Sequence, residues 1–208
     1  MNDDFENTFF LEPEILIAAY KNGIFPMAES KDGSIYWYFP ERRAIFDIYN
    51  TKIAKSTRQL IKKKIYTYSV DVNFEDVIKY CGARDETWIN SQIIEIYTTL
   101  FKLGYAHSVE VYRNDSLVGG LYGVAIGGAF FGESMFNLEP NTAKLAFAYL
   151  LEILKYNKFE LLDSQFINKF TEQLGAIEID SQDYLKRLKK AINLNCNFFE
   201  PENYFKNI

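Results

Sequence analysis

The sequence predicts an α+β fold in which helices flank one mostly antiparallel sheet. Between residues 107 and 136, three successive runs (HSVEVY, LVGGLYGVAI and AFFGESMF) have the composition and length of strands. On both sides of this region, apolar residues recur at helical spacing instead. The 208 residues are 48% hydrophobic and 17% aromatic, which is enough apolar surface to bury a core, so a globular protein is expected.

The N-terminal part should contain one short helix and a small strand or hairpin. Pro13 suits a first helical turn, apolar residues follow it, and Gly23 can supply a left-handed stop. The aromatic stretch at 35–40 (IYWYFP) comes after the turn residues SKDGS at 30–34. These features predict a small N-terminal accessory lobe.

Helices and one strand are expected between this lobe and the three-strand region. Residues 54–64 are helix formers, and 66–72 (YTYSVDV) alternate as a strand does. Asn73 can cap a helix that runs to Tyr80. Apolar residues at helical spacing predict a further helix over 91–103, which ends at Gly104.

The three strands should form an antiparallel meander because only turn residues separate them. Asn114 and Asp115 join the first two strands, and Gly127 and Gly128 join the last two. A long amphipathic helix is expected from Pro140 or Asn141 to about Tyr156, followed by a strand at 159–163 (FELLD). The helix residues expected to pack on the sheet are Leu145, Ala148, Leu151 and either Ile153 or Leu154.

This order of elements resembles an acyltransferase-like (GNAT-like) fold, in which a mostly antiparallel sheet splays open around a substrate cleft. The polar ends of neighbouring strands would then meet at one place. We expect a small N-terminal α+β domain over residues 1–50 and the acyltransferase-like catalytic domain over residues 51–208.

The charge distribution leaves room for a local nucleic-acid contact. The net charge of −5 and pI of about 5.1 argue against coating of nucleic acid by bulk charge. The run KIAKSTRQLIKKK at 52–64 nevertheless has six cationic residues and no acidic one, so it is either a solvated helix face or a phosphate-binding patch. For KRLKK at 186–190, the solvated face is favoured.

Targeting segments and metal sites are not expected. The first ten residues lack the basic start and apolar core of a signal peptide, and no run approaches the ~20 apolar residues that cross a bilayer. A cytoplasmic location without membrane contact is therefore expected. Cys81 and Cys196 are too few and too far apart for a disulfide framework or an ordinary zinc site, so both are interpreted as packing residues.

Two acidic residues stand where buried apolar side chains would be usual. Glu133 lies among phenylalanines and a methionine in FFGESMF, and strand alternation puts Phe131, Glu133 and Met135 on one face. Asp163 ends the apolar strand FELLD, and Gln165 follows two residues later. Each acid alone could be a structural carboxylate bonded to backbone amides. Two acids at the ends of strands that flank one helix favour a functional cleft.

Missing motifs narrow the chemistry. GxxxxGK[ST] does not occur, and residues 135–144 lack the Gly-rich turn that holds coenzyme A phosphates. GxSxG is also absent, and His107, the single histidine, is interpreted as structural. No cofactor is expected, and an acyl donor would have to arrive already activated.

Seven motifs together resemble the bacterial leucyl/phenylalanyl-tRNA–protein transferases over nearly the whole chain. They are GIFPM (23–27), WYFPERRAIF (37–46), TWI (87–89), GYAHSVEVY (104–112), LVGGLYGVAIGGAFFGESMF (117–136), LLDSQFIN (161–168) and LGA (174–176). The resemblance implies transfer of Leu or Phe, with Met possible, from aminoacyl-tRNA to proteins that begin with Arg or Lys. The new N-terminus is an N-end-rule signal that marks the protein for degradation.

The resemblance also implies roles for individual residues. We hypothesise that Asp163 orients the acceptor amine and eases its deprotonation, that Gln165 positions the reacting groups, and that Glu133 pairs with the cationic acceptor. Implied for the aminoacyl side-chain pocket are Leu121, Phe130, Met135, Leu150 and Leu162. Implied for tRNA binding are Trp88, by stacking on the terminal adenine, and Lys55, Arg58, Lys62, Lys63 and Lys64. Taken singly, the pocket residues and Trp88 could equally be plain core.

Two departures from the family pattern leave the donor preference open. Phe170 stands where many relatives have His, and Leu121 stands where some have Met. Two other functions remain as alternatives: a coenzyme A-dependent acyltransferase, which the missing phosphate loop disfavours, and a catalytically inactive tRNA-binding module. Nothing in the sequence demands an oligomer, so a monomer is expected.

Overall fold

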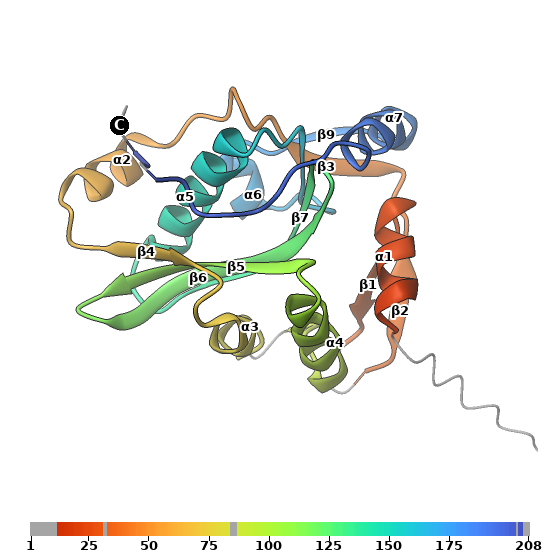
Figure 1. The fold of residues 1–208 in the computed structure, drawn as a ribbon, viewed down its shortest axis with the longest axis horizontal. Helices are drawn as coiled ribbons and strands as arrows, with labels where there is room; N and C mark the ends of the chain where they lie inside the picture. Colours follow the sequence, from red (N-terminus) through yellow and green to blue (C-terminus); the bar gives the residue numbers. More distant parts are fainter. Residues whose placement is uncertain (1–11, 31–32, 84–86, 203, 206–208) are drawn as a thin grey trace, which may run out of the picture.

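A computed structural model describes residues 12–30, 33–83, 87–202 and 204–205. Its centre is a seven-stranded sheet in the order β4-β5-β6-β7-β8-β3-β9, and β1 and β2 form a separate hairpin (Figure 1). The strands are β1 (Phe25–Ala28), β2 (Ile35–Tyr38), β3 (Arg42–Phe46), β4 (Thr67–Val70), β5 (Ala106–Arg113), β6 (Ser116–Ile126), β7 (Ala129–Asn137), β8 (Leu161–Asp163) and β9 (Ile177–Asp180). The helices are α1 (Pro13–Lys21), α2 (Lys55–Lys62), α3 (Phe74–Cys81), α4 (Ser91–Lys102), α5 (Thr142–Tyr156), α6 (Lys169–Leu174) and α7 (Ser181–Ala191).

The predicted meander is confirmed as β5, β6 and β7. Asn114 and Asp115 turn the chain between β5 and β6 with positive φ values, and Gly127 does so between β6 and β7 at φ +58°. A left-handed backbone is tolerated best by Asn, Asp and Gly, which is why these residues occupy the turns. The antiparallel pairing then follows from the short connections.

The sheet splays between β7 and β8, the parallel pair among the described strands. Their pairing runs from Ala129 opposite Leu161 to Phe131 opposite Asp163 and then stops. β7 continues to Asn137, while the chain after Asp163 turns away to β3. The mostly antiparallel, splayed α+β fold predicted from the sequence is therefore confirmed, and the strands separate where the polar residues begin.

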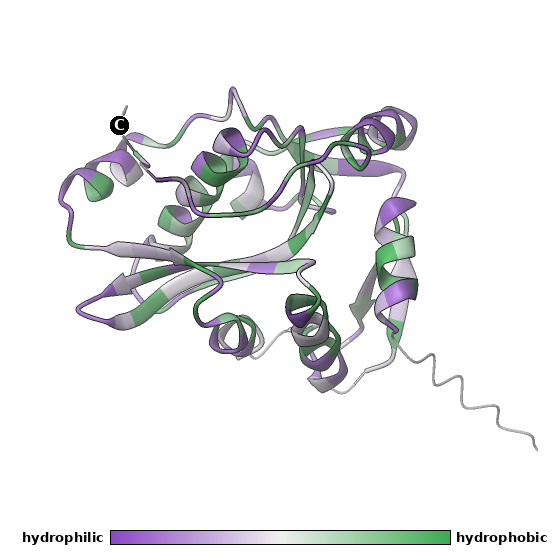
Figure 2. Cartoon of the chain, viewed as in Figure 1, coloured by the Kyte–Doolittle hydropathy of each residue, from purple (hydrophilic) through white to green (hydrophobic). Residues whose placement is uncertain are grey.

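Helices cover both faces of the sheet, so the core has two halves (Figure 1). Helix α5 packs on one face, and α3 and α4 pack on the other. The predicted α5 contacts are confirmed because Leu145, Ala148, Leu151, Ile153 and Leu154 are all buried. Figure 2 shows hydrophobic residues along much of the strands and on α3, α4 and α5, which is the pattern expected of helices packed on a sheet.

The N-terminal part comprises α1 and the β1–β2 hairpin. Helix α1 ends before Gly23, which has the expected left-handed φ of +79°, and its Leu16 and Tyr20 are buried in the core. The predicted turn at 30–34 lies partly outside the described residues. Strand β3, which the predicted boundary at residue 50 assigns to the small domain, pairs with β8 and β9 in the main sheet. The division into two domains stays a prediction, and the part outside the main sheet ends before Arg42.

One predicted cap is wrong. Helix α3 begins after Asn73 as expected, but the Asn73 side chain makes no cap and instead donates to the Tyr112 hydroxyl at 2.7 Å. The buried Glu110 carboxylate accepts hydrogen bonds from the backbone N–H groups of Val72 and Asn73, at 3.0 and 2.8 Å. A carboxylate from a neighbouring strand thus holds the start of this helix.

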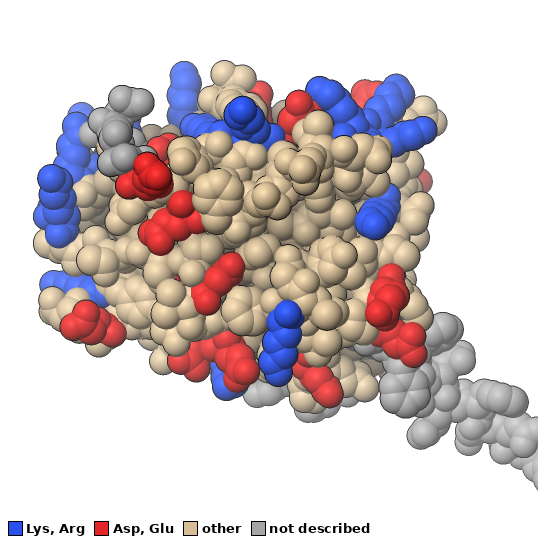
Figure 3. Space-filling model, in the orientation of Figure 1, with Lys and Arg blue, Asp and Glu red and all other residues tan. Residues whose placement is uncertain are grey.

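Cationic side chains cluster at two separate places, on α2 and on α7 (Figure 3). In Figure 3, Lys and Arg side chains project where α2 lies and also where α7 lies. On and just after α2, Lys55, Arg58, Lys62, Lys63 and Lys64 are all exposed. The α2 sequence therefore forms a solvated basic face, and its Thr57 is buried.

Candidate active site

Glu133 occupies a β-bulge in β7. The β6–β7 register pairs Tyr122 with Ser134 and Gly123 with Gly132, so Glu133 has no partner in that ladder. A bulge adds one residue to a strand and re-aims the side chains beyond it. The prediction that Phe131, Glu133 and Met135 share one face is therefore wrong: Phe131 joins the core half of α3 and α4, whereas Met135 packs on the α5 half. The signal for a bulge was Gly132 inside the strand pattern.

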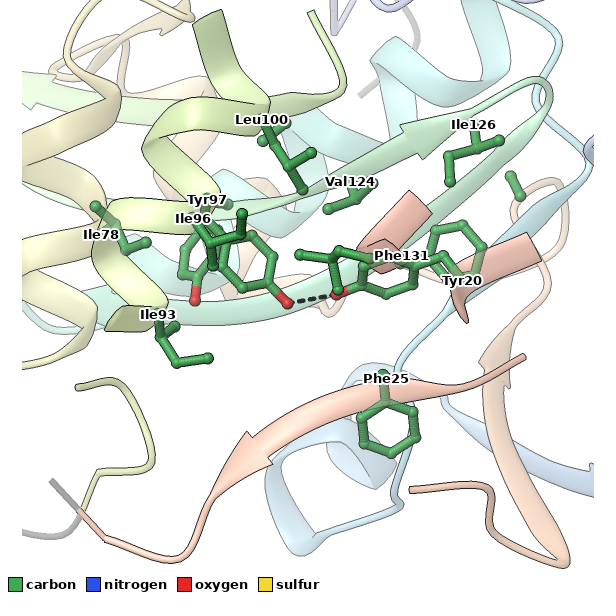
Figure 4. Close-up of a cluster of buried hydrophobic side chains, with 14 of the residues drawn as sticks. Tyr20, Phe25, Ile78, Ile93, Ile96, Tyr97, Leu100, Val124, Ile126 and Phe131 are labelled. Carbon is green, nitrogen blue, oxygen red and sulfur yellow. Dashed lines mark hydrogen bonds between the residues drawn. The ribbon is translucent and has the colours of Figure 1, made fainter. Parts of the chain in front are cut away.

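The Glu133 carboxyl group is bonded on both oxygens. Its Oε1 accepts hydrogen bonds from the Tyr20 hydroxyl at 2.6 Å and from Nε2 of Gln165 at 3.1 Å. Its Oε2 lies 3.0 Å from the Tyr97 hydroxyl. Tyr20 and Tyr97 also share a hydrogen bond, and Figure 4 shows it as the dashed line between two rings that point toward each other. Neither tyrosine was predicted from the sequence to be functional.

This environment changes the acidity of all three groups. Burial raises the pKa of Glu133 to about 7, because removing water disfavours the charged form more than hydroxyl groups that donate to an ionised carboxylate would favour it. Burial and the nearby Glu133 carboxyl raise the pKa of Tyr20 and of Tyr97 well above the usual value. Both tyrosines therefore stay protonated, and Glu133 titrates near neutral pH.

Asp163 is fully buried and paired with Arg43. The guanidinium Nε lies 2.9 and 3.1 Å from the two carboxylate oxygens, and Nη2 lies 2.7 Å from Oδ2. Tyr184 donates to the same Oδ2 at 2.6 Å. Arg43 also donates to the carbonyl of Gly23 at 3.0 Å, which ties the N-terminal part to β8. Arg43 was not predicted as a site residue.

Gln165 is held in a left-handed backbone conformation with φ +56°. Such a conformation is uncommon outside Gly and needs support from its surroundings. Its N–H donates to Oδ1 of Asp163 at 2.9 Å, and its carbonyl accepts from the N–H of Ala44 at 3.0 Å. These bonds fix the turn after β8, from which the side-chain amide reaches Glu133.

A cavity of about 570 Å³ lies between the diverging strands. Glu133, Asp163 and Gln165 all border it, as the sequence predicted for their positions. Of the predicted aminoacyl-pocket residues, Leu121, Met135, Leu150 and Leu162 line it. Phe130 is not among the described lining residues; it is fully buried and stacks on Phe198. The apolar lining also includes residues that were not predicted: Phe46, Ala143 and Phe147.

The residues predicted to bind tRNA fall into two places. Trp88 is half-buried and borders the cavity, as does Phe170, which stands where many relatives have His. The basic residues lie on α2, which packs against α5. Since α5 supplies one wall of the cavity, α2 lies on the outer side of that wall.

The remaining polar candidates lie apart from this cavity. Nδ1 of His107 lies 2.7 Å from Oδ2 of Asp71, and its ring stacks on Phe198, which indicates a packing role. Cys81 and Cys196 are free thiols. Among the described residues, no group of three His, Cys, Asp or Glu side chains could hold a metal ion. None of the described helices is long and apolar enough to cross a membrane.

Comparisons with known proteins identify the relatives of this chain. A family model described as leucyl/phenylalanyl-tRNA protein transferase matches residues 45–189, and the model of its N-terminal domain matches residues 11–41. A leucyl/phenylalanyl-tRNA–protein transferase of Prosthecochloris aestuarii is 42% identical over 187 residues, which cover 88% of this chain and 96% of that protein. The enzyme of the same name from Gloeobacter violaceus is 44% identical over 188 residues and covers 90% and 97%.

Solved structures resemble the fold at much lower identity. FemX superposes with a TM-score of 0.51 at 14% identity, over 80% of this chain and 66% of that chain. A GCN5-related N-acetyltransferase-like protein from Streptococcus suis has a TM-score of 0.36 at 12% identity, over 80% and 64%. The FemX likeness shows a shared fold alone.

Proposed function

The chain belongs to the leucyl/phenylalanyl-tRNA–protein transferase family, and we propose that it moves Leu or Phe from aminoacyl-tRNA to the N-terminal Arg or Lys of acceptor proteins. The family gives the class of reaction, aminoacyl transfer from tRNA to a protein. The acceptor residues and the roles of individual side chains are the proposed part. The observation that carries the proposal is the convergence of Glu133, Gln165 and Asp163 at the apolar cavity.

The reaction needs alignment more than activation. An aminoacyl ester is already an activated donor, and the acceptor amine has only to lose its proton and attack the ester carbonyl. Holding two reactants in attacking geometry can supply roughly 7 to 11 kcal/mol of the barrier. The α-amine, with a pKa of about 7.7 to 8.0, is mostly protonated at neutral pH, so its deprotonation has to be part of the reaction.

The cavity suits the side chain of the donor. Leu121, Met135, Leu150 and Leu162 give it flexible aliphatic walls, and Phe147 adds an aromatic one. Unbranched or γ-branched side chains can adapt to both a Leu and a Phe donor. We assign this cavity to the aminoacyl side chain, with the ester directed toward Gln165 and Glu133.

Glu133 and Gln165 are the groups proposed to meet the acceptor. Gln165 presents an amide that can hydrogen-bond the reacting amine or ester, and Glu133 can pair with a cationic N-terminal residue. Asp163 has both oxygens bonded by Arg43, Tyr184 and the Gln165 N–H. We therefore propose that Asp163 acts by fixing the turn that positions Gln165, in place of direct contact with the amine.

The tRNA is proposed to lie across α2. The exposed cations Lys55, Arg58 and Lys62 to Lys64 would neutralise phosphates of the acceptor stem, and Trp88 at the cavity would stack on the unpaired terminal adenine. We propose a cytoplasmic location, because charged tRNA and new protein N-termini occur in the cytoplasm. We propose a monomer, because nothing in the sequence demands an oligomer.

A transfer assay tests the proposal. Purified protein would be given Leu-, Phe- and Met-tRNA with peptides that begin with Arg, Lys, Asp or Glu. We expect product with Leu- or Phe-tRNA and with Arg or Lys peptides. Product with Asp or Glu peptides alone would show that the proposed acceptor is wrong. Tight coenzyme A binding would favour the acyltransferase alternative. Binding of tRNA without any transfer product would favour the inactive tRNA-binding module.

A further inference from the structure

Tyr20, Tyr97 and Glu133 touch one another in pairs. The two tyrosine hydroxyls share a hydrogen bond, Tyr20 reaches Oε1 of Glu133 at 2.6 Å, and Tyr97 lies 3.0 Å from Oε2. Both tyrosines are 0% exposed. They come from α1 and α4, on the side of the sheet opposite α5, and with Glu133 they close a ring at the edge of the cavity that Glu133 borders.

The ring requires three hydrogens. Each hydrogen bond contains one hydrogen, and the two hydroxyl groups supply two. If Glu133 were ionised, only the two hydroxyl hydrogens would be present, so one of the three contacts would bring two oxygens together without a hydrogen between them. A carboxyl proton on Oε2 that donates to Tyr97, with Tyr97 donating to Tyr20 and Tyr20 to Oε1, satisfies all three contacts.

The charged surroundings of Glu133 favour the same state. Asp163 faces it from β8, and the negative charge of Asp163 opposes a second carboxylate. Arg43 on β3 acts in the other direction, but its charge is paired with Asp163. Gln165 contributes a neutral amide, and Tyr122 of β6 packs its ring on Tyr97. Burial raises the pKa of Glu133 to about 7, in the same direction as the hydrogen count. Tyrosine hydroxyls that donated to an ionised carboxylate would lower this pKa, so the direction of each hydrogen bond decides their effect.

We propose that Tyr20 and Tyr97 are positioning residues that keep Glu133 protonated in the free protein through this closed ring. Glu133 then releases the proton when the cationic side chain of an N-terminal Arg or Lys binds beside it. The second half rests on the proposed function, because it assigns the acceptor to Glu133. The O–H bond of the carboxyl breaks, the proton goes to solvent, and the resulting carboxylate pairs with the guanidinium or ammonium group. The α-amine is cationic in every acceptor at neutral pH, but it is assigned to Gln165. An N-terminal residue with a neutral side chain therefore places no cation at Glu133, which stays a neutral acid.

The first experiment measures the titration of Glu133 in the free protein. Glutamates labelled with ¹³C at the side-chain carboxyl carbon would be followed by NMR from about pH 4 to about pH 9. This range covers both ordinary and raised pKa values of carboxyl groups. We expect one glutamate to titrate near neutral pH, and its signal to be missing in Glu133→Gln. Titration of every glutamate at the ordinary acidic value would overturn the ring.

The tyrosine variants test the ring itself. Tyr20→Phe and Tyr97→Phe each remove one hydroxyl, which takes part in two of the three contacts. When Glu133 is protonated, both of these contacts are hydrogen bonds and both are lost. When Glu133 is ionised, the variant also removes a contact between two oxygens that has no hydrogen, and this removal is favourable. We therefore expect the pKa of Glu133 to fall in both variants. A rise in both would overturn the ring, because it would mean that the hydroxyls only donate to an ionised carboxylate. Tyr149→Phe is the matched control, because it removes a buried hydroxyl that is bonded to a different glutamate, Glu200. It should leave the pKa of Glu133 unchanged.

The second experiment tests the coupling to the acceptor. At about pH 6, below the pKa, a peptide that begins with Arg should move the Glu133 signal to its ionised position, while a peptide that begins with Gln should not. A Glu133 signal that stays protonated when the Arg peptide shifts the Gln165 side-chain amide signal would overturn the coupling. No shift at Gln165 would overturn the acceptor assignment and the coupling with it, while the titration of the free protein would still decide the ring.

Discussion

Arg43 shows how one buried side chain can organise a site that it does not enter. Its guanidinium fixes Asp163, Asp163 fixes the backbone of Gln165, and Gln165 bonds Glu133. A buried ion pair is weak support for stability by itself, since desolvation offsets much of the attraction. The value of this pair lies in geometry, because a planar fork bound to two carboxylate oxygens leaves Asp163 one orientation.

Replacing Arg43 with Lys should therefore impair the reaction more than binding. An ammonium keeps the charge but cannot bond Asp163 through two nitrogens and also reach the Gly23 carbonyl. Misplacement of a positioning group by about 1 Å can cost on the order of 100-fold in rate, so we expect kcat to fall by roughly this factor, with a smaller change in KM. Steady-state transfer kinetics measure both parameters.

Arg42→Lys is the matched control, because Arg42 is exposed on the same strand and its nearest recorded partner is the Glu178 carbonyl at 3.4 Å. It should leave kcat unchanged. Equal loss in both variants would mean that the loss in Arg43→Lys does not come from the orientation of Asp163.

At the scale of single elements, α5 has two apolar faces with different functions. Leu150 faces the cavity, whereas Leu151 is fully buried in the core and is not among the described residues that line it. Truncating either leucine removes the same atoms. Only the first change should alter the space in which the donor side chain lies.

Leu150→Ala should change donor preference. The loss of apolar wall costs a Leu donor more than a Phe donor, since the larger ring can occupy the vacated space. We expect kcat/KM with Leu-tRNA to fall roughly 10- to 200-fold and the Phe/Leu ratio to rise. Leu151→Ala should lower the melting temperature without changing that ratio. An unchanged ratio in both variants would remove this cavity from the donor site.

Helix α2 offers a second element-scale test. Replacing Lys62, Lys63 and Lys64 with Ala should weaken tRNA binding, because the exposed cations would no longer neutralise phosphates. If all three contact duplex phosphates, the slope of log K against log salt concentration should fall in magnitude by roughly 3. Filter binding across a series of salt concentrations would measure this.

The charge-matched control replaces Lys186, Lys189 and Lys190 of α7. Lys186 and Lys190 are paired with Asp183 and Glu160, so this surface has less free positive charge than α2. The salt slope should remain that of the wild type. A loss of slope in the α7 variant alone would place the tRNA on the other basic surface.

At the scale of the whole molecule, Glu133 makes stability depend on pH. In the unfolded chain it releases its proton above its ordinary pKa of 4.5, while the folded protein keeps the proton until about pH 7. The folded state therefore binds more protons between these values, and the contribution of Glu133 to the free energy of unfolding falls as pH rises through that window. Above about pH 7 the loss is complete and constant.

Glu133→Gln should reverse this loss. A neutral amide cannot ionise, and its N–H can replace the carboxyl proton in the ring. The free energy of unfolding of the variant minus that of the wild type should rise between about pH 4.5 and pH 7 and then level off, with a gain of at most about 3 kcal/mol. Urea unfolding at a series of pH values measures the difference. A constant difference across that range would contradict a raised pKa for Glu133.

The sequence by itself determined most of the elements and the identity of the polar residues at the strand ends. Alternation and turn residues predicted β5, β6 and β7, and helical spacing predicted α5, because these patterns are local in the chain. Glu133, Asp163 and Gln165 stood out because polar groups interrupted apolar strands, and a run of motifs carried the family resemblance.

Only the tertiary structure decided how these residues meet. The bulge at Glu133 puts Met135 on the other face of the strand. The alternation rule could not predict this, because it assumes that no residue is added to the strand. Tyr20 and Tyr97 are 77 residues apart and Arg43 and Asp163 are 120 apart, so no local period links them. Strand β3 enters the sheet between β8 and β9 for the same reason. Local patterns specify which face of an element is apolar, whereas partners distant in the chain are chosen by packing and by the need to satisfy buried polar groups.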